Sequence, residues 1–177
     1  MARKIILGTL LSVTERDGVD EVLEQWRHER PDLDSSPIGV VGRVSRLARE
    51  LEQRLEPVYR EHGLEPGWHD VLATLRRSGP KYRLRPSDFS GALMLTSSGT
   101  TKRLDKLEQA GLVTREPDPD DRRGTLIALT DEGRALIDRL TEAHLANEAR
   151  LLGVLSAKER DELAGLLRKL QLGLPAR

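Results

Sequence analysis

Apolar residues recur at helical spacing along most of this chain of 177 residues, and the pattern predicts a mainly helical protein. Val19, Val22, Leu23 and Trp26 occupy one face of a helix predicted over residues 18–30. The same periodicity predicts further helices over residues 37–62, 68–78, 130–152 and 156–173.

Prolines and capping residues near the ends of the predicted helices agree with these ranges. Pro37 lacks an N–H group and fits the first position of the second helix. Pro57 interrupts that helix and should kink it or end its regular part. Ser156 and Glu159 have the spacing of a capping box at the start of the last helix.

Shorter elements are predicted between residues 86 and 130. A first helix is expected over residues 86–93. After hydroxyl residues that suit an N-cap, a second helix turns Leu104 and Leu107 inward and ends before Gly111. Two short helices in this order, joined by a turn, are typical of a helix-turn-helix.

A hairpin follows the second helix. Residues 112–115 and 125–129 have strand composition, and the intervening segment is rich in Pro, Asp, Arg and Gly, as turns are. We therefore predict a mainly α protein with a small β wing: a winged helix-turn-helix with N- and C-terminal dimerisation helices.

The terminal helices carry more leucine than a small winged helix covers alone, which favours a homodimer. The predicted divisions are an N-terminal tail or extra segment at 1–17, the added and N-terminal dimerisation helices at 18–62, the winged helix at 63–130 and the C-terminal dimerisation helices at 131–177.

Several polar residues are candidates for DNA contacts. With the leucines fixing the inward side of the second helix, Ser98 and Lys102 point outward, with Thr101 and Lys106 beside them. Arg122 and Arg123 occupy the hairpin tip, where a wing enters a minor groove. For any one residue on the helix, an ordinary solvent-facing position is the alternative.

Charge and composition narrow the classes of function. The net charge is zero, but residues 76–106 carry eight basic side chains against two acidic ones, which favours DNA locally. There is no cysteine, so disulfides, thiol switches and thiolate metal sites are excluded. No nucleophile elbow, phosphate-binding loop or zinc-protease motif occurs, so we expect no enzyme and no cofactor. No segment is apolar enough for a membrane span, and we expect a cytoplasmic protein.

The segment "KLEQAGLVTREPDPDDRRGTLIALTDEG" resembles the signature of the MarR family of bacterial transcriptional regulators. The resemblance implies a homodimer that binds palindromic double-stranded DNA and is released or reshaped by a small ligand. It also implies that Asp118 or Asp121 braces the hairpin through an arginine rather than touching DNA.

A narrower resemblance is to the urate-responsive branch of this family, which has an added N-terminal helix. It implies a small anionic effector, urate or a related purine, at Trp26, Asp70 in "WHDVLATL", Arg85 in "LRPSDF" and Arg103 in "TTKRLDKL". The Asp motif departs from that branch, because Trp68 stands two residues before Asp70 rather than three. Arg103 also lies on the flank of the leucine stripe, so a planar anion there could engage its guanidinium.

Plainer roles remain open for these residues. Trp26 could anchor the first helix, Asp70 could favour a helix dipole, and Arg85 could contact phosphate. Other open functions are a regulator that answers to a tricarboxylate or aromatic carboxylate, or to zinc through His62 and His69 with Asp70 or Glu61. From a different class, the winged helix could bind another protein instead of DNA.

Overall fold

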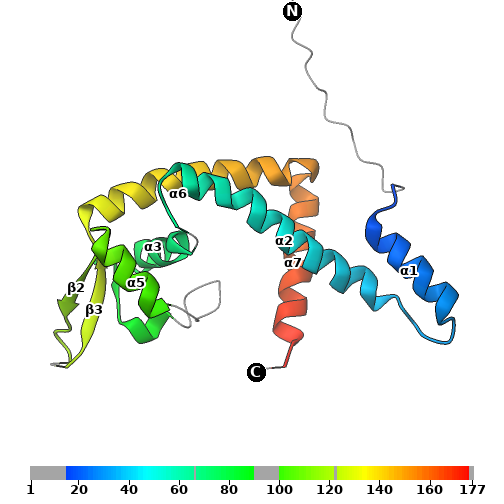
Figure 1. The fold of residues 1–177 in the computed structure, drawn as a ribbon, viewed down its shortest axis with the longest axis horizontal. Coiled ribbons are helices and arrows are strands. Elements are labelled where there is room, and N and C mark those ends of the chain that lie inside the picture. Colours follow the sequence, from blue (N-terminus) through cyan, green and yellow to red (C-terminus); the bar gives the residue numbers. More distant parts are fainter. Residues whose placement is uncertain (1–14, 66, 90–99, 122, 176–177) are drawn as a thin grey trace, which may run out of the picture. The chain divides into compact units, whose positions relative to one another are not determined.

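The computed structural model describes residues 15–65, 67–89, 100–121 and 123–175 (Figure 1). Its elements, in chain order, are α1 (Gly18–Glu29), α2 (Pro37–Glu61), α3 (Trp68–Arg77), β1 (Arg83–Leu84), the 3-10 helix η1 (Pro86–Asp88), α5 (Thr100–Gln109), β2 (Val113–Pro117), β3 (Thr125–Leu129), α6 (Asp131–Leu151), the 3-10 helix η2 (Leu152–Val154) and α7 (Ala157–Gly173). This mainly helical order with a small antiparallel sheet confirms the predicted fold class. Within the described residues, no helix is long and apolar enough to cross a membrane.

The chain forms two compact units, residues 1–52 with 148–177 and residues 53–147. The second unit holds the main apolar core. Leu72, Leu75, Phe89, Leu107 and Ile127 in this core are almost completely buried. The described residues of this unit include α3, α5 and the strands β1, β2 and β3.

The wing is a three-stranded sheet of order β1-β3-β2, antiparallel throughout. Val113 pairs with Leu129 and Pro117 with Thr125, so β2 continues two residues beyond the predicted strand. β1 was not predicted, because its two residues form a strand only by pairing with Ala128 and Ile127 of β3. In Figure 1, the hairpin of β2 and β3 lies beside α5.

Pro57 lies inside α2, which continues to Glu61, so the helix passes through the proline and ends close to the predicted residue 62. One prediction for the helices is corrected. The segment from Pro86 begins as a single 3-10 turn, η1, rather than as an α-helix. The rest of that predicted helix and the proposed caps of the next fall in residues 90–99, outside the described residues.

Thr130 joins the start of α6 to the turn that follows α5. Its Oγ1 donates a hydrogen bond to the carbonyl of Gly111 at 2.7 Å and accepts one from the N–H of Gly133 at 3.0 Å. Its own N–H donates to the carbonyl of Leu112 at 3.2 Å. Thr130 therefore caps α6 and also holds the turn that leads into the wing.

In the first unit, α1 packs closely on α2. A Cβ atom at Gly42 would lie 3.4 Å from the side chain of Val19, and one at Gly39 would lie 3.5 Å from Leu23. Val19 and Leu23 are the buried residues of α1. The two glycines therefore let the apolar face of α1 approach the backbone of α2.

Candidate nucleic-acid interface and effector site

The polar face of α5 is open to solvent in the way the sequence predicts. Leu104 and Leu107 are buried in the core, and Thr101 and Lys102 on other faces are exposed. Lys106 is also exposed, but its Nζ lies 2.5 Å from the Oε2 of Glu65. Ser98 lies outside the described residues.

Two carboxylates of α5 are held by Arg115 of β2. The Nη2 of Arg115 lies 2.6 Å from the Oδ1 of Asp105, and its Nη1 contacts Glu108. These contacts neutralise acidic groups on the helix that carries Lys102 and tie that helix to the wing. Sequence reasoning missed Arg115, because spacing rules apply within one helix and give no partner across the intervening turn.

The base of the wing is braced by Asp118. Its side chain is only 1% exposed, and its Oδ2 accepts a hydrogen bond from the Nε of Arg85 at 2.5 Å. Its Oδ1 accepts the N–H of Asp120 at 2.9 Å. The guanidinium of Arg85, together with that N–H, holds the pKa of Asp118 below its ordinary value. Of the two aspartates proposed as the brace, the structure places Asp118 in that position.

The tip of the wing is stabilised by its own turn. The N–H of Arg123 donates to the Oδ1 of Asp121 at 3.0 Å, and the N–H of Gly124 donates to the carbonyl of Asp121 at 2.8 Å. The side chain of Arg123 is exposed. Arg122 lies outside the described residues.

Arg103 turns away from the exposed face of α5 and covers the start of α3. A Cβ atom built on Gly67 would lie 2.7 Å from the Nε of Arg103 and 2.8 Å from its Cζ. Gly67 has a φ of 80° and occupies the N-cap position, where it offers no side-chain oxygen to the helix. A positive guanidinium therefore lies at a helix N-terminus that is itself electropositive, and the two together favour an anion.

Asp70 lies in the first turn of α3, at the same end as Gly67. Its Oδ1 is 3.6 Å from the Nδ1 of His69. The structure thus brings Asp70 and Arg103 to one end of α3. Arg85 contacts the wing through Asp118, and Trp26 belongs to the other compact unit.

The histidines of the zinc hypothesis make other contacts. His69 stacks on Tyr59, with ring centroids 4.6 Å apart, and lies 4.6 Å from the ring of His144. The Nδ1 of His62 lies 2.8 Å from the carbonyl of Val58. No group of three or more metal-binding side chains occurs in the part of the chain that is described, and zinc gains no support.

Trp26 lies on α1 and is 45% exposed. It borders a small, mainly apolar pocket of about 220 Å³. The pocket lining, which comes from α1, the following loop and α2, is Trp26, Arg30, Leu33, Asp34, Ser35, Pro37 and Ile38. The tryptophan is thus only partly used in packing within its own unit.

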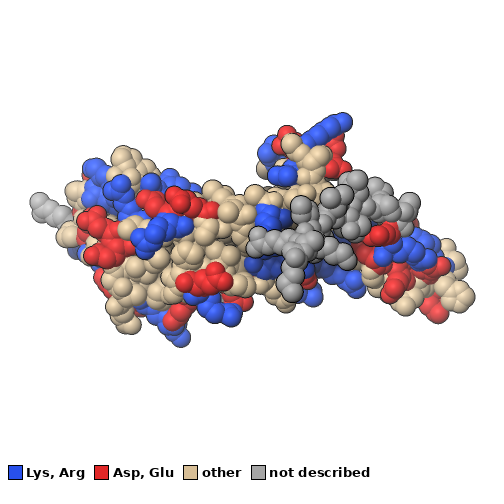
Figure 2. Space-filling model, turned by 90° about the horizontal axis from the view of Figure 1, so that it is seen from above, with Lys and Arg blue, Asp and Glu red and all other residues tan. Residues whose placement is uncertain are grey.

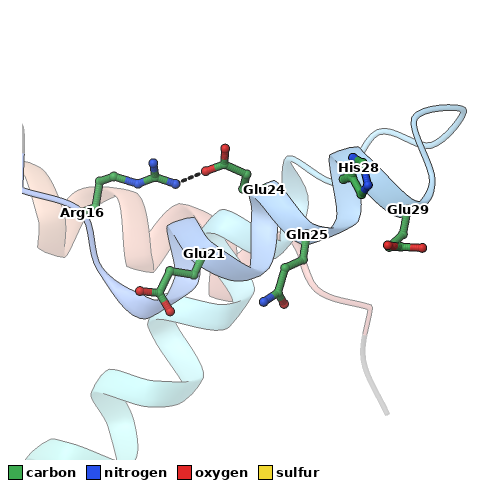
Figure 3. Close-up of a pocket in the computed structure, with 6 residues that line it drawn as sticks. All are labelled: Arg16, Glu21, Glu24, Gln25, His28 and Glu29. Atoms are coloured by element: carbon green, nitrogen blue, oxygen red, sulfur yellow. Dashed lines mark hydrogen bonds and ion pairs between the residues drawn. The ribbon is translucent and has the colours of Figure 1, made fainter.

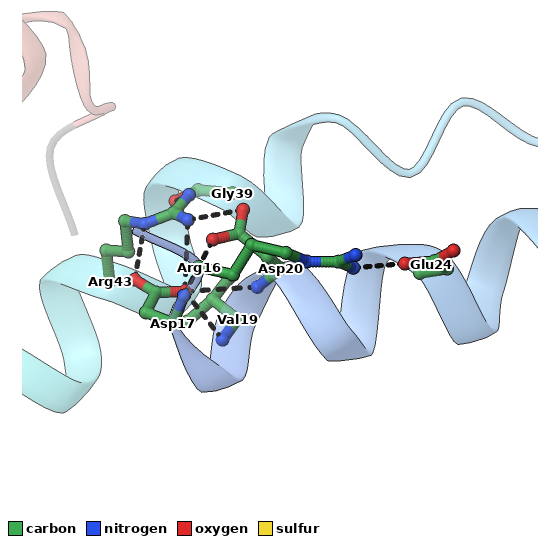
Figure 4. A network of polar contacts seen from close by, with 7 residues as sticks. All are labelled: Arg16, Asp17, Val19, Asp20, Glu24, Gly39 and Arg43. Carbon is green, nitrogen blue, oxygen red and sulfur yellow. Dashed lines mark hydrogen bonds and ion pairs between the residues drawn. The ribbon is translucent and has the colours of Figure 1, made fainter. Parts of the chain in front are cut away.

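Ion pairs between Arg43 of α2 and two aspartates hold the start of α1 on α2 (Figure 4). Arg43 donates from Nε to Asp17 at 2.8 Å and from Nη2 to Asp20 at 2.7 Å. Asp17 also caps α1 by accepting the N–H groups of Val19 and Asp20. The hydrogen bond from Arg43 lowers the pKa of Asp17 to about 2, so this carboxylate stays charged at neutral pH.

The outer face of α1 is charged and open. A shallow hollow of about 570 Å³ lies along this face. Figure 3 shows the side chains that line it. Its lining residues are Arg16, Glu21, Glu24, Gln25, His28 and Glu29. Basic and acidic side chains are likewise interspersed on the face of the molecule seen in Figure 2. The hollow is the solvated side of an amphipathic helix, opposite the face that packs on α2.

Comparison with known proteins decides the family. Residues 62–124 match the model of the MarR family. The transcriptional regulator PecS of Dickeya dadantii is 44% identical over 153 residues, which cover 86% of this chain and 92% of PecS. The chain belongs to the MarR family. It is therefore a DNA-binding transcriptional regulator and not an enzyme, as the sequence predicted.

Solved structures of DNA-binding proteins agree in fold. Sco3205 of Streptomyces coelicolor, solved in complex with DNA, is 26% identical with a TM-score of 0.71 over 81% of this chain and 91% of that chain. BpsR of Bordetella bronchiseptica, whose DNA binding is regulated by 6-hydroxynicotinic acid, is 26% identical with a TM-score of 0.61 over 72% of this chain and 92% of that chain. The winged helix of this MarR protein thus has a solved counterpart in a complex with DNA.

The wing of this MarR protein gives a first prediction. Replacing Arg122 and Arg123 together by Ala should weaken operator binding roughly tenfold or more and reduce the slope of log affinity against log salt by about 1 for each arginine that binds the DNA. The reason is that fewer counterions are released when fewer cationic side chains bind the DNA. Fluorescence anisotropy with operator DNA at several salt concentrations measures both quantities.

The matched control removes two exposed arginines elsewhere, Arg27 of α1 and Arg49 of α2. It changes the net charge by the same amount but should leave the salt slope near that of the wild type. If the wing variant and the control have equal slopes, the wing does not contact DNA.

Proposed function

We propose that this protein is a cytoplasmic repressor that binds palindromic operators as a homodimer and releases them when a small anionic ligand binds. The observation that carries the proposal is the exposed polar face of α5 beside a wing that Asp118 and Arg85 brace. Thr101, Lys102 and Lys106, with Ser98, would meet the major groove and its flanking phosphates. Arg122 and Arg123 would meet the minor groove.

Exposed apolar side chains on the terminal helices support the homodimer. Val40, Val41, Val44 and Leu47 of α2 and Leu163, Leu166, Leu167 and Leu170 of α7 are each more than a third exposed. Apolar surface of this extent is costly to leave in water and is typical of an interface. A second copy would cover it and would match the twofold symmetry of a palindrome.

Assembly gives a second prediction. Light scattering at micromolar concentration should give twice the 19.8 kDa mass of the chain. Leu166→Asp with Leu170→Asp should give a monomer and abolish tight operator binding, since each subunit then binds its half-site alone. Lys169→Asp, a charged position on the same helix, serves as the control. A stable wild-type monomer with full operator affinity would exclude the dimer.

The effector site that we propose lies at the start of α3. Arg103 and the electropositive N-terminus of α3, whose N-cap Gly67 offers no side-chain oxygen, would hold an anion. Asp70, in the first turn, would be the negative group that the anion displaces or rearranges. Arg85 would link the ligand to the wing through Asp118. Trp26 is included on the resemblance to the urate-responsive branch, which makes urate or a related purine the first candidate ligand.

An aromatic carboxylate is the second candidate, because 6-hydroxynicotinic acid regulates the DNA binding of BpsR. A planar carboxylate would use the same guanidinium of Arg103 through paired hydrogen bonds. A tricarboxylate would pair with the positive charge of Arg103 but, having no ring, would not stack on the indole of Trp26.

A titration tests the whole proposal. A labelled fragment from upstream of the protein's own gene is bound by the protein, and the complex is then titrated separately with urate, xanthine, 6-hydroxynicotinate and citrate. Salt-dependent, sequence-selective binding that one of these anions reverses supports the repressor. An absence of binding to any palindromic fragment would favour the alternative of a protein-interaction module.

A further inference from the structure

Two residues of the loop between α2 and α3 lie against the recognition helix α5. The carboxylate of Glu65 lies 2.5 Å from the Nζ of Lys106, and Gly67 lies directly under the guanidinium of Arg103. Lys106 and Arg103 are three residues apart on α5, so they lie on one side of the helix. Both contacts come from a loop more than thirty residues away in the sequence.

This loop is anchored firmly enough to hold its carboxylate in place. Leu64, immediately before Glu65, is 5% exposed and Trp68, just after the loop, is 8% exposed, and both belong to the core of the DNA-binding unit. The N–H of Leu64 donates to the carbonyl of Tyr59 at 3.0 Å, and the N–H of Trp68 donates to the carbonyl of Glu65 at 3.1 Å. Glu65 thus directly follows a buried residue, and its carbonyl accepts a hydrogen bond from the first residue of α3.

This inference rests on the proposed function, in which α5 contacts DNA. Lys106 is an exposed cation on that helix, and such a cation is a natural partner for a phosphate. In this structure, that position is already taken by a carboxylate. The side chains of Lys106 and Glu65 are 45% and 51% exposed, so the ion pair faces solvent and can exchange its partner. A phosphate and Glu65 therefore compete for one ammonium group.

We propose that Glu65 is an affinity-setting residue for operator DNA, because its carboxylate occupies Lys106 and must be displaced by a DNA phosphate. The competition lowers operator affinity by the free energy of one solvent-exposed ion pair, which is small. It leaves the fold and the base contacts unchanged. Operator affinity is thus set partly by a residue outside the helix-turn-helix.

The test is a double-mutant cycle on operator affinity. Glu65→Gln keeps the shape of the side chain but removes its charge, and it should tighten operator binding about two- to fivefold. Lys106→Gln should weaken binding and reduce the salt slope by about 1. In the Glu65→Gln, Lys106→Gln double variant, the gain from Glu65→Gln should disappear, because no ammonium remains to be released.

Glu56→Gln is the matched control. It removes the same charge from an exposed carboxylate that pairs with Arg60 of α2, so its operator affinity should stay within about twofold of the wild type. Thermal unfolding and circular dichroism of each variant accompany the affinities, since Glu65→Gln should leave the fold intact.

Two results would overturn the proposal. If Glu65→Gln weakens binding or leaves it unchanged, the ion pair positions α5 or has no effect on DNA. If Glu65→Gln tightens binding equally with and without Lys106, the gain is general charge repulsion from DNA and not competition for this ammonium group.

Discussion

Arg103→Ala should remove the response to the effector while operator binding persists. A ligand that weakens operator binding has a coupling free energy of typically about 1–3 kcal/mol, which corresponds to roughly 5–150-fold in DNA affinity. Arg103 lies on the recognition helix yet covers the start of α3, so an anion that engages it would move or rotate that helix. Without the guanidinium, ligand binding and helix position are no longer linked.

The measurement is a titration of the preformed protein–operator complex with urate and with 6-hydroxynicotinate. Each variant is compared with its own affinity in the absence of ligand, because Arg103→Ala can change DNA binding by itself. Trp26→Phe should weaken the response if the indole stacks on the ligand, and Asp70→Asn should shift the ligand concentration required.

Arg60→Ala, on the exposed side of α2, is the control for loss of a positive charge. Because coupling is reciprocal, the ligand must also bind less tightly to the wild-type DNA complex than to the free protein. If wild type, Trp26→Phe, Asp70→Asn and Arg103→Ala all release DNA at the same ligand concentration, the proposed effector site is wrong.

Gly133→Ala should destabilise the protein by about 2–4 kcal/mol, although alanine is normally the better helix former. A Cβ atom at Gly133 would lie 2.0 Å from the carbonyl oxygen of Leu112, far inside van der Waals contact. That carbonyl is backbone and also accepts the N–H of Thr130, so it cannot move aside without breaking the link between α6 and the turn after α5. Urea denaturation should show the decrease in the free energy of unfolding.

Gly165→Ala in α7 is the matched control, because a Cβ atom there meets nothing within 4 Å among the described residues. This substitution should stabilise the helix by about 0.5–1 kcal/mol. A Gly133→Ala variant that is as stable as the wild type would show that α6 does not approach Leu112 as closely as described.

Much of the secondary structure follows from local pattern. The apolar spacing of α1, α3, α6 and α7 places these helices to within a residue or two of their observed ends. Ser156 and Glu159 form the predicted capping box. These features depend on neighbours within one or two turns of a helix, so a single sequence contains the information.

Other features needed distant partners. β1 exists only because β3 lies beside it. Asp118 was one of two candidates for the wing brace, and the choice depended on where Arg85 lies after folding.

The sequence by itself determined the fold class, the family resemblance, and the faces of the recognition helix, because apolar periodicity and turn residues act locally. The tertiary structure brought together the ion pairs of this helix, Glu65 with Lys106 and Arg115 with Asp105, and placed Arg103 over Gly67. Charge and spacing leave many pairings possible for each of these side chains. The attraction between two charges is strong only when the groups are close in space. Their separation along the sequence does not say how close they are, so the pairs form only when α3, α5 and the wing pack around one core.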